Sequence, residues 1–187
     1  MNIQDIYRTV NEATQAEFPK QALHELIALQ AARTPDAIAV VSGDQTQNYR
    51  ELDEQSNQLA NYLRSQGIGR GDLVGLCCNR DLSTPALLVG IMKSGAGYVP
   101  LDPDYPVERL AYMVENSEVK HIIANVDQAD LTQEFPTPVT FADDWDKIAA
   151  AGKRPVDAEI EPQTDICLLY TSPSPRDLST SRMPSSA

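Results

Sequence analysis

Short apolar runs alternate with amphipathic helical patterns along most of this chain, and this alternation constrains its fold more than any other feature. Apolar runs of strand length occur at 37–41, 73–78, 97–101 and 121–124, and helical patterns occur at 22–34, 49–65, 83–92 and 107–116. Because parallel strands need long crossover connections, this order predicts an α/β fold with a largely parallel sheet flanked by helices. The run 73–78 is apolar throughout, which is typical of a strand covered on both faces.

Turn and capping residues mark the ends of these elements. Pro35 ends the first helix, and Ser42-Gly43-Asp44 predicts a hairpin whose second strand is 45–48. Ser83 or Thr84 is a candidate N-cap for a helix that takes Pro85 in its first turn. Two further strands are expected at 138–141 and 164–166.

The charge balance excludes two classes of partner. The 187 residues carry 15 Lys and Arg against 27 Asp and Glu, a formal net charge of -12 at pH 7. Such an excess of negative charge repels phosphate backbones and anionic lipid surfaces, so we expect neither nucleic-acid nor membrane binding. No apolar run approaches the ~20 residues of a membrane span, and the first residues are polar and acidic. We therefore expect a cytoplasmic protein.

The cysteines and histidines do not form a metal-binding or disulfide pattern. Cys77 and Cys78 are adjacent, so on a strand they point to opposite faces and are poorly placed to bridge each other. Together with Cys167 they are expected to be reduced core thiols. His24 and His121 lie far apart in the sequence, and neither belongs to a metal-ligand motif.

Three segments superficially suggest phosphate or metal chemistry. The glycines of 67–71 follow a helix and precede a strand, which is the reverse of a dinucleotide-binding fingerprint and predicts a helix stop. Lys93 comes at the end of a helix, where it is expected to offset the negative helix terminus. Five acidic residues could suggest metal binding: Asp102, Asp104, Asp143, Asp144 and Asp146. The run 143–146 lacks the glycine and terminal glutamate of a calcium loop, so these residues are interpreted as solvated turn acids. From residue chemistry alone, we expect no catalytic, cofactor-binding or metal-ligating residue.

Two longer segments carry a family pattern. The segment Leu23 to Ala37 resembles the opening of an adenylation domain of nonribosomal peptide synthetases, and Tyr49-Arg50-Glu51-Leu52 with Asn57-x-Leu59-Ala60 resembles that family's first core motif. The segment Lys93 to Leu110, which includes Gly-Ala-Gly-Tyr-Val-Pro-Leu-Asp-Pro, resembles the second core motif. Its Tyr-Pro-x-Glu-Arg extension, at residues 105–109, favours the peptide-synthetase branch over general acyl-CoA synthetases.

The resemblance implies an ATP-dependent ligase of the AMP-binding, adenylate-forming superfamily. Such enzymes use Mg-ATP to convert an amino acid into an aminoacyl adenylate and pyrophosphate, and then load the acyl group onto the phosphopantetheine thiol of a carrier protein. The implied partners are the amino acid substrate, a peptidyl carrier protein and an upstream condensation domain. The two matched motifs belong largely to the family's scaffold, so the resemblance assigns no catalytic, cofactor or metal residue to this chain.

The chain departs from the family pattern after Ile166. The family continues with a Gly-rich, Thr-Ser-Gly phosphate loop containing lysine, whereas this chain has Pro173 and Pro175, which lack the backbone N–H donors of such a loop. Residues 173–187 include eight Ser and Pro among fifteen, with no Gly and no aromatic residue, a composition typical of disorder. Residues 167–177 and 181–187 also resemble translated sequencing adapters.

We therefore expect three segments: 1–21 as a linker or leading arm, 22–166 as the N-terminal part of an adenylation domain, and 167–187 as a disordered, non-native tail. On this interpretation the chain is an inactive fragment that binds no ATP. Two alternatives remain open. One is another adenylate-forming ligase for acyl or aryl acids, and the other is a non-catalytic α/β interaction module that kept only the scaffold.

Overall fold

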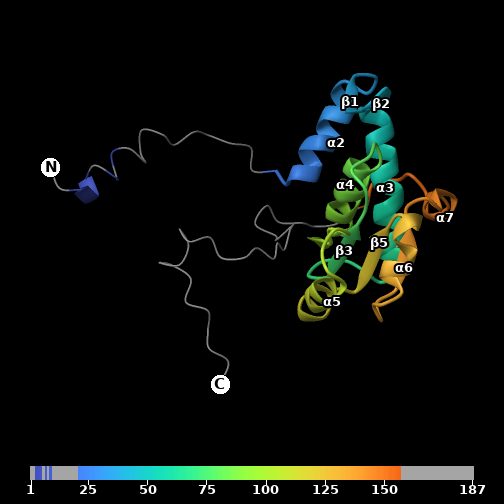
Figure 1. Ribbon diagram of the computed structural model, residues 1–187. Coiled ribbons are helices and arrows are strands. Elements are labelled where there is room, and N and C mark those ends of the chain that lie inside the picture. The colour runs from blue at the N-terminus through green and yellow to red at the C-terminus, as the bar shows by residue number, and fades with distance from the viewer. Residues whose placement is uncertain (1–2, 6, 8, 10–20, 157–187) are drawn as a thin grey trace.

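The structure, a computed structural model, describes residues 3–5, 7, 9 and 21–156. Helices and strands alternate along this part of the chain (Figure 1). The helices are α2 (Leu23–Arg33), α3 (Tyr49–Ser65), α4 (Thr84–Ser94), α5 (Val107–Asn116), η1 (Val126–Gln128), α6 (Ala129–Thr132) and α7 (Trp145–Ala149). The strands are β1 (Ile38–Ser42), β2 (Gln45–Asn48), β3 (Leu73–Cys77), β4 (Gly97–Pro100), β5 (His121–Ala124) and β6 (Val139–Phe141).

Four of the strands form a parallel sheet in the order β4-β3-β5-β6. The remaining two, β1 and β2, form a separate antiparallel hairpin. The hairpin and α2 lie at one end of the molecule, and α5 and α6 lie at the other (Figure 1). The α/β class with a parallel sheet flanked by helices is therefore confirmed.

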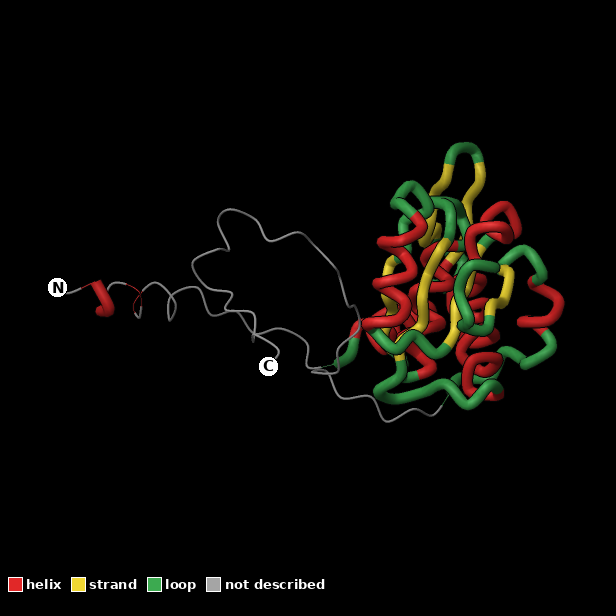
Figure 2. Tube along the Cα trace, turned by 60° about the horizontal axis from the view of Figure 1, so that its bottom comes forward, coloured by secondary structure: helices red, strands yellow, loops and turns green. Residues whose placement is uncertain are grey.

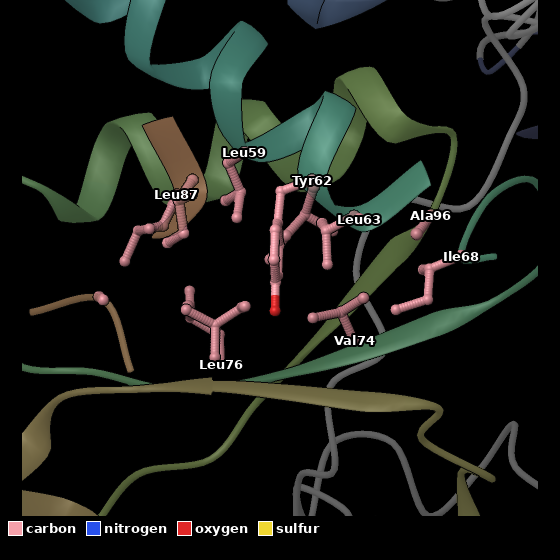
Figure 3. Packing of buried hydrophobic residues seen from close by; sticks show 12 residues of the cluster. Leu59, Tyr62, Leu63, Ile68, Val74, Leu76, Leu87 and Ala96 are labelled. Carbon is pink, nitrogen blue, oxygen red and sulfur yellow. The ribbon is translucent and has the colours of Figure 1, made fainter. Parts of the chain in front are cut away.

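The sheet buries both of its faces, because the side chains of each strand alternate between two apolar clusters. Figure 2 shows helices (red) on either side of the strands (yellow) of this sheet. On one face, Val74 and Leu76 of β3 pack with residues of α3 and α4; Leu59, Tyr62 and Leu63 point from α3 towards them (Figure 3). On the other face, Cys77 packs with residues of α5, β4 and β5. A strand with this surrounding needs apolar residues on both sides, which explains the continuous apolar sequence of 73–77.

Helix α3 begins with a reciprocal capping arrangement. The Asn48 side chain accepts a hydrogen bond from the Glu51 backbone N–H at 2.9 Å, and the Glu51 carboxylate accepts one from the Asn48 N–H at 2.9 Å. Two orphan donors are satisfied in this way, so the helix begins directly after β2 without a connecting loop.

Helix α4 begins differently from the sequence-based prediction. Ser83 occupies the N-cap position, but its side chain makes no capping hydrogen bond. Instead, the Asp81 carboxylate accepts hydrogen bonds from the backbone N–H groups of Ser83 and Thr84, at 2.8 and 3.2 Å. The helix ends at Gly95, whose φ of 93° is a left-handed conformation that glycine adopts without strain.

The bounds of the longer elements were predicted correctly from the sequence, whereas η1, α6 and α7 were missed. These three span three to five residues each, which is too short to show a helical period. The strand expected at 164–166 lies outside the described residues, as do Cys167 and the tail 167–187. None of the described helices is both long and apolar enough to cross a membrane.

Candidate functional site

A crevice opens where β3 and β4 end. Helix α4, which follows β3, packs on one face of the sheet, whereas α5, which follows β4, packs on the opposite face. The two loops therefore diverge at the carboxyl ends of neighbouring strands, and such a divergence leaves a ligand-sized gap in open parallel sheets. Here the gap has a volume of about 720 Å³ and is lined by residues of both loops and by Gln128 of η1.

The β3–α4 loop forms one wall of this crevice and is held by side-chain hydrogen bonds. The Asn79 backbone N–H donates to the Asn125 side chain at 2.8 Å, and the Asn79 side chain donates to Asp127 at 2.9 Å. The Thr84 hydroxyl donates to the Asn79 carbonyl at 2.7 Å. This wall is thus fixed both to α4 and to the loop that follows β5.

The crevice carries charges of both signs over an apolar floor. Arg80 lines it from the β3–α4 loop, and Asp102 and Asp104 line it from the β4–α5 loop. Apolar side chains, including Leu76 and Leu88, line it as well. The arrangement can bind a small polar molecule, but it holds no nucleophile paired with a base among the described residues.

The two described cysteines are not suited to act as nucleophiles. Cys77 is buried in the α5-side cluster, and Cys78 packs against the opposite cluster, so they point to opposite faces of the sheet as predicted. Burial raises the pKa of the Cys77 thiol to about 11, and burial also raises the pKa of Cys78 strongly. Both thiols are therefore protonated at neutral pH.

Lys93 lies in the last turn of α4, as expected, and its side chain is buried between α3 and α4, which the sequence did not predict. Its ammonium donates to the Asp53 carboxylate at 2.6 Å and to the Asn57 side-chain oxygen at 2.8 Å, and its side chain is only 7% exposed. Burial lowers the pKa of Lys93, while the hydrogen bond and the charge of Asp53 oppose that shift. One sequence signal could have indicated this site: Asp53 and Asn57 are spaced four residues apart, which places both of these polar side chains on one face of α3.

A smaller cavity of about 230 Å³ adjoins this ion pair. His24 and Glu25 of α2 line it together with Asp53, Asn57 and Lys93. The pKa of His24 is lowered mainly by burial, against the raising effect of Glu25. Lys93 is already paired with Asp53, and the cavity lies where α2, α3 and α4 meet.

Polar residues of α3 hold the segment 152–154 against the helix. The Asn61 side chain donates to the carbonyls of Gly152 and Arg154, at 3.1 and 2.8 Å, and the Asn57 side chain donates to the Lys153 carbonyl at 3.3 Å. These asparagines lie outside the apolar stripe of α3, yet they bind backbone that is more than 90 residues away in the sequence. No sequence pattern indicates such long-range pairing.

The other segments that suggested chemistry have structural roles. Gly67 and Gly71 have φ values of 79° and 85°, which confirms a helix stop instead of a phosphate loop. The Asp143 carboxylate accepts a hydrogen bond from the Val126 N–H at 2.7 Å, and Asp144 is the N-cap residue of α7. Among the described residues, no three His, Cys, Asp or Glu side chains come together as metal ligands.

A parallel sheet covered on both faces, with a polar crevice at its carboxyl edge, defines an α/β protein of the small-molecule-binding class. Residues 27–174 match the AMP-binding enzyme family, and the chain belongs to that family. The match extends eight residues beyond Ile166.

Individual relatives narrow the comparison. The chain is 39% identical over 160 residues to tyrocidine synthase 2 of Brevibacillus parabrevis, which covers 85% of this chain and 4% of that protein. The structure resembles the crystal structure of the nonribosomal peptide synthetase FmoA3, with a TM-score of 0.76 and 30% identity over 86% of this chain and 17% of that chain. It also resembles VinN in complex with 3-methylaspartate, with a TM-score of 0.74 and 25% identity over 82% of this chain and 44% of that chain. The chain thus spans only a small part of its curated relatives.

Proposed function

We propose that this chain is part of an amino-acid-activating domain of nonribosomal peptide biosynthesis. In the proposed reaction, the amino acid carboxylate attacks the α-phosphorus of ATP, and pyrophosphate leaves. The phosphopantetheine thiol of a carrier protein then attacks the acyl carbon, and AMP leaves. The observation that carries this proposal is the 39% identity to tyrocidine synthase 2 across 85% of the chain.

The residues that resemble the second core motif support this assignment through their role in the scaffold. Val99 and Leu110 are fully buried in the α5-side cluster. The Arg109 guanidinium lies over the Tyr105 ring, with its central carbon 4.1 Å from the ring centroid. The motif therefore forms the path from the end of α4 through β4 into α5, and it leaves the reaction itself to other residues.

The described residues do not fit the phosphates of ATP or a magnesium ion. The α4 N-terminus, where an anion would be favoured, already has its Ser83 and Thr84 N–H groups bound to Asp81. The Asp81 carboxylate would repel a phosphate at that position. Since Lys93 is paired with Asp53, we derive no step of the reaction from the described residues.

The proposal includes the division of the chain into a leading arm (1–21), the N-terminal part of the adenylation domain (22–166) and a non-native tail (167–187). It also includes ATP and magnesium as cofactors of the complete domain, a peptidyl carrier protein and an upstream condensation domain as partners, and a cytoplasmic location.

Amino-acid-dependent exchange of pyrophosphate into ATP tests the proposal. The complete domain would be recovered from source DNA, expressed, and incubated with each proteinogenic amino acid in the presence of magnesium. We expect exchange with one amino acid or a few related ones, and transfer of that amino acid to a carrier protein that bears phosphopantetheine. A domain with Lys-to-Ala substitution in its recovered phosphate loop is the control.

The other two hypotheses predict different results in the same assay. Exchange driven by aryl or fatty acids, with none from amino acids, would identify a different adenylate-forming ligase. Absence of exchange with every acid, from a domain that is folded by circular dichroism, would favour the non-catalytic interaction module.

A further inference from the structure

A β-bulge in β1 places two exposed apolar side chains on the same face of the β1–β2 hairpin. The register against β2 shifts by one residue after Ile38. Ile38 pairs with Asn48. Val41 pairs with Thr46, two residues away on β2. Since alternate residues of β2 share a face, Ile38 and Val41 share that face too, and their exposed fractions are 61% and 66%.

The opposite face of the hairpin packs towards α3. Gln47 is only 4% exposed, and its side chain donates a hydrogen bond to the Gln55 side chain of α3 at 2.7 Å. Val40, which pairs with Gln47, is half-buried on the same side. The hairpin therefore has one face against the molecule and one apolar face, made by Ile38 and Val41, that is open to solvent. We call the open one the hairpin face.

A second exposed apolar surface lies near the start of the chain. Residues 3–5, 7 and 9 are helical. Ile3 and Tyr7 are one helical turn apart, and their exposed fractions are 67% and 63%. In the sequence, Ile6 and Val10 continue the same helical spacing. A helix this short is marginal in water on its own, so its stability requires a surface on which this apolar side can pack.

The chain between these two surfaces has the length needed to bring them together. Residues 10–20 connect the N-terminal helix to the start of α2, and the hairpin lies at the far end of α2 (Figure 1). Helix α2 has 11 residues and is therefore about 16 Å long. Eleven residues of flexible chain have an r.m.s. end-to-end distance of about 20 Å and reach about 40 Å at most. A tether whose r.m.s. length matches the span gives the highest effective concentration.

We propose that segment 3–10 docks as a helix on the hairpin face of the same chain, with Ile3 and Tyr7 packed against Ile38 and Val41. A second copy of the chain offers the same surface. At micromolar protein concentration, however, a tethered helix competes at an effective concentration on the order of a thousandfold higher. The contact does not depend on adenylation, so the proposal goes beyond the function proposed above.

Amide hydrogen exchange of the full 187-residue chain, followed by mass spectrometry, tests the proposal. The reference is a synthetic peptide of residues 1–12, which cannot dock. We expect residues 3–9 to exchange at least tenfold more slowly in the chain than in the peptide, because docking stabilises the helix. Equal exchange rates in the chain and the peptide would overturn the proposal.

A pair of matched variants locates the docking surface. Val41→Asp should remove the slow exchange of residues 3–9. Val126→Asp should leave it unchanged, because Val126 is an equally exposed valine (58%) of η1, which precedes α6 at the other end of the molecule. Exchange in β3 checks that both variants keep the fold. Equal exchange of residues 3–9 in the two variants would exclude the hairpin face as the docking surface.

A reciprocal variant and a dilution series identify the occupant. Tyr7→Asp leaves the hairpin sequence intact, and it should speed the exchange of residues 38–42 at least twofold, because the covering helix is lost. Protection of residues 3–9 should be the same at 50 and 0.5 µM protein, since docking within one chain is independent of concentration. Protection that disappears on dilution would identify a second copy of the chain as the occupant and would overturn docking within one chain.

Discussion

The Lys93–Asp53 ion pair lies between α3 and α4. Because it is largely buried, its removal shows how burial changes the contribution of an ion pair to the free energy of unfolding. The Lys93 side chain is 7% exposed and the Asp53 side chain 24%. Asp53→Ala removes the carboxylate that pairs with the buried ammonium and leaves the Asn57 side-chain oxygen and the residue 53 carbonyl as neutral acceptors, so we expect the free energy of unfolding to fall by about 3 kcal/mol. Urea unfolding followed by circular dichroism measures the change.

The control for this prediction is the exposed pair Arg50–Asp36, whose side chains are 53% and 83% exposed. Asp36→Ala should cost much less than Asp53→Ala, because solvent screens the exposed pair. Similar losses at the two sites would mean that burial does not govern the contribution of Lys93.

His121 gives the protein a pH-dependent stability. The His121 Nε2 forms a hydrogen bond with the Thr140 hydroxyl at 2.9 Å, and the Thr140 hydroxyl forms another with the Tyr62 hydroxyl at 2.8 Å. In Figure 3 the Tyr62 hydroxyl points towards the sheet. The pKa of His121 is lowered, first by burial and then by the charge of Lys147. The unfolded chain, with a His pKa of about 6.5, therefore binds a proton at mildly acidic pH that the folded chain does not bind.

Because the folded pKa is the lower one, stability is retained above pH 6.5 and declines as the pH falls towards the folded pKa. Between pH 7.5 and 5.5 we expect a loss of up to about 1.4 kcal/mol per lowered histidine. Urea unfolding at the two pH values should show a smaller loss in His121→Asn than in the unchanged chain. His24→Gln, at the other histidine with a lowered pKa, serves for comparison. An identical pH dependence in His121→Asn and the unchanged chain would rule out His121 as its source.

At the scale of elements, α3 and α4 approach closely at Gly90. A Cβ atom at this position would lie 2.8 Å from the Leu59 Cβ and 3.0 Å from the Ser56 carbonyl oxygen, neither of which can move without shifting α3. We expect Gly90→Ala to lower the free energy of unfolding by about 2 kcal/mol, although alanine favours a helix by about 1 kcal/mol.

Gly75 of β3 provides the matched comparison for Gly90. A Cβ atom there would lie 2.8 Å from the Leu101 Cδ1 and 3.2 Å from the Ile122 Cγ1. Both atoms belong to side chains that can rotate, so Gly75→Ala should cost less, about 1 kcal/mol. Urea unfolding of both variants checks the order, and a larger loss at Gly75 would contradict it.

The elements that the sequence predicts correctly are those with a strong local signal. Helix α3 has an apolar stripe, the capping residues Asn48 and Glu51, and seventeen residues over which to show its period. By contrast, α6 has four residues and α7 has five, so these helices depend on tertiary contacts that no local pattern indicates. The burial of Lys93 was missed for a related reason, because its partner Asp53 lies 40 residues away in the sequence.

At the scale of the whole molecule, the crevice could not be predicted from any single motif. Its walls come from two loops whose directions depend on which face of the sheet α4 and α5 cover. That choice follows from the strand order β4-β3-β5-β6, which a sequence pattern leaves open. The family resemblance, in contrast, depends on contiguous residues between Leu23 and Leu110, so it was evident in the sequence.

The proposed boundary at Ile166 is tested by shortening the chain. Residues 173–187 include eight Ser and Pro among fifteen and no aromatic residue, so they can bury little apolar surface. Chains 1–166, 1–174 and 1–187 should therefore unfold at the same urea concentration with the same m-value, since an equal m-value indicates an equal surface exposed on unfolding. The chain 1–174 is included because the family match ends at that residue.

A loss of more than about 1 kcal/mol in 1–166 but not in 1–174 would move the boundary to residue 174, because residues 167–174 would then belong to the cooperatively folded unit. A loss in both shortened chains would instead mean that residues 175–187 contribute to the fold, and the interpretation of the tail as non-native would be wrong.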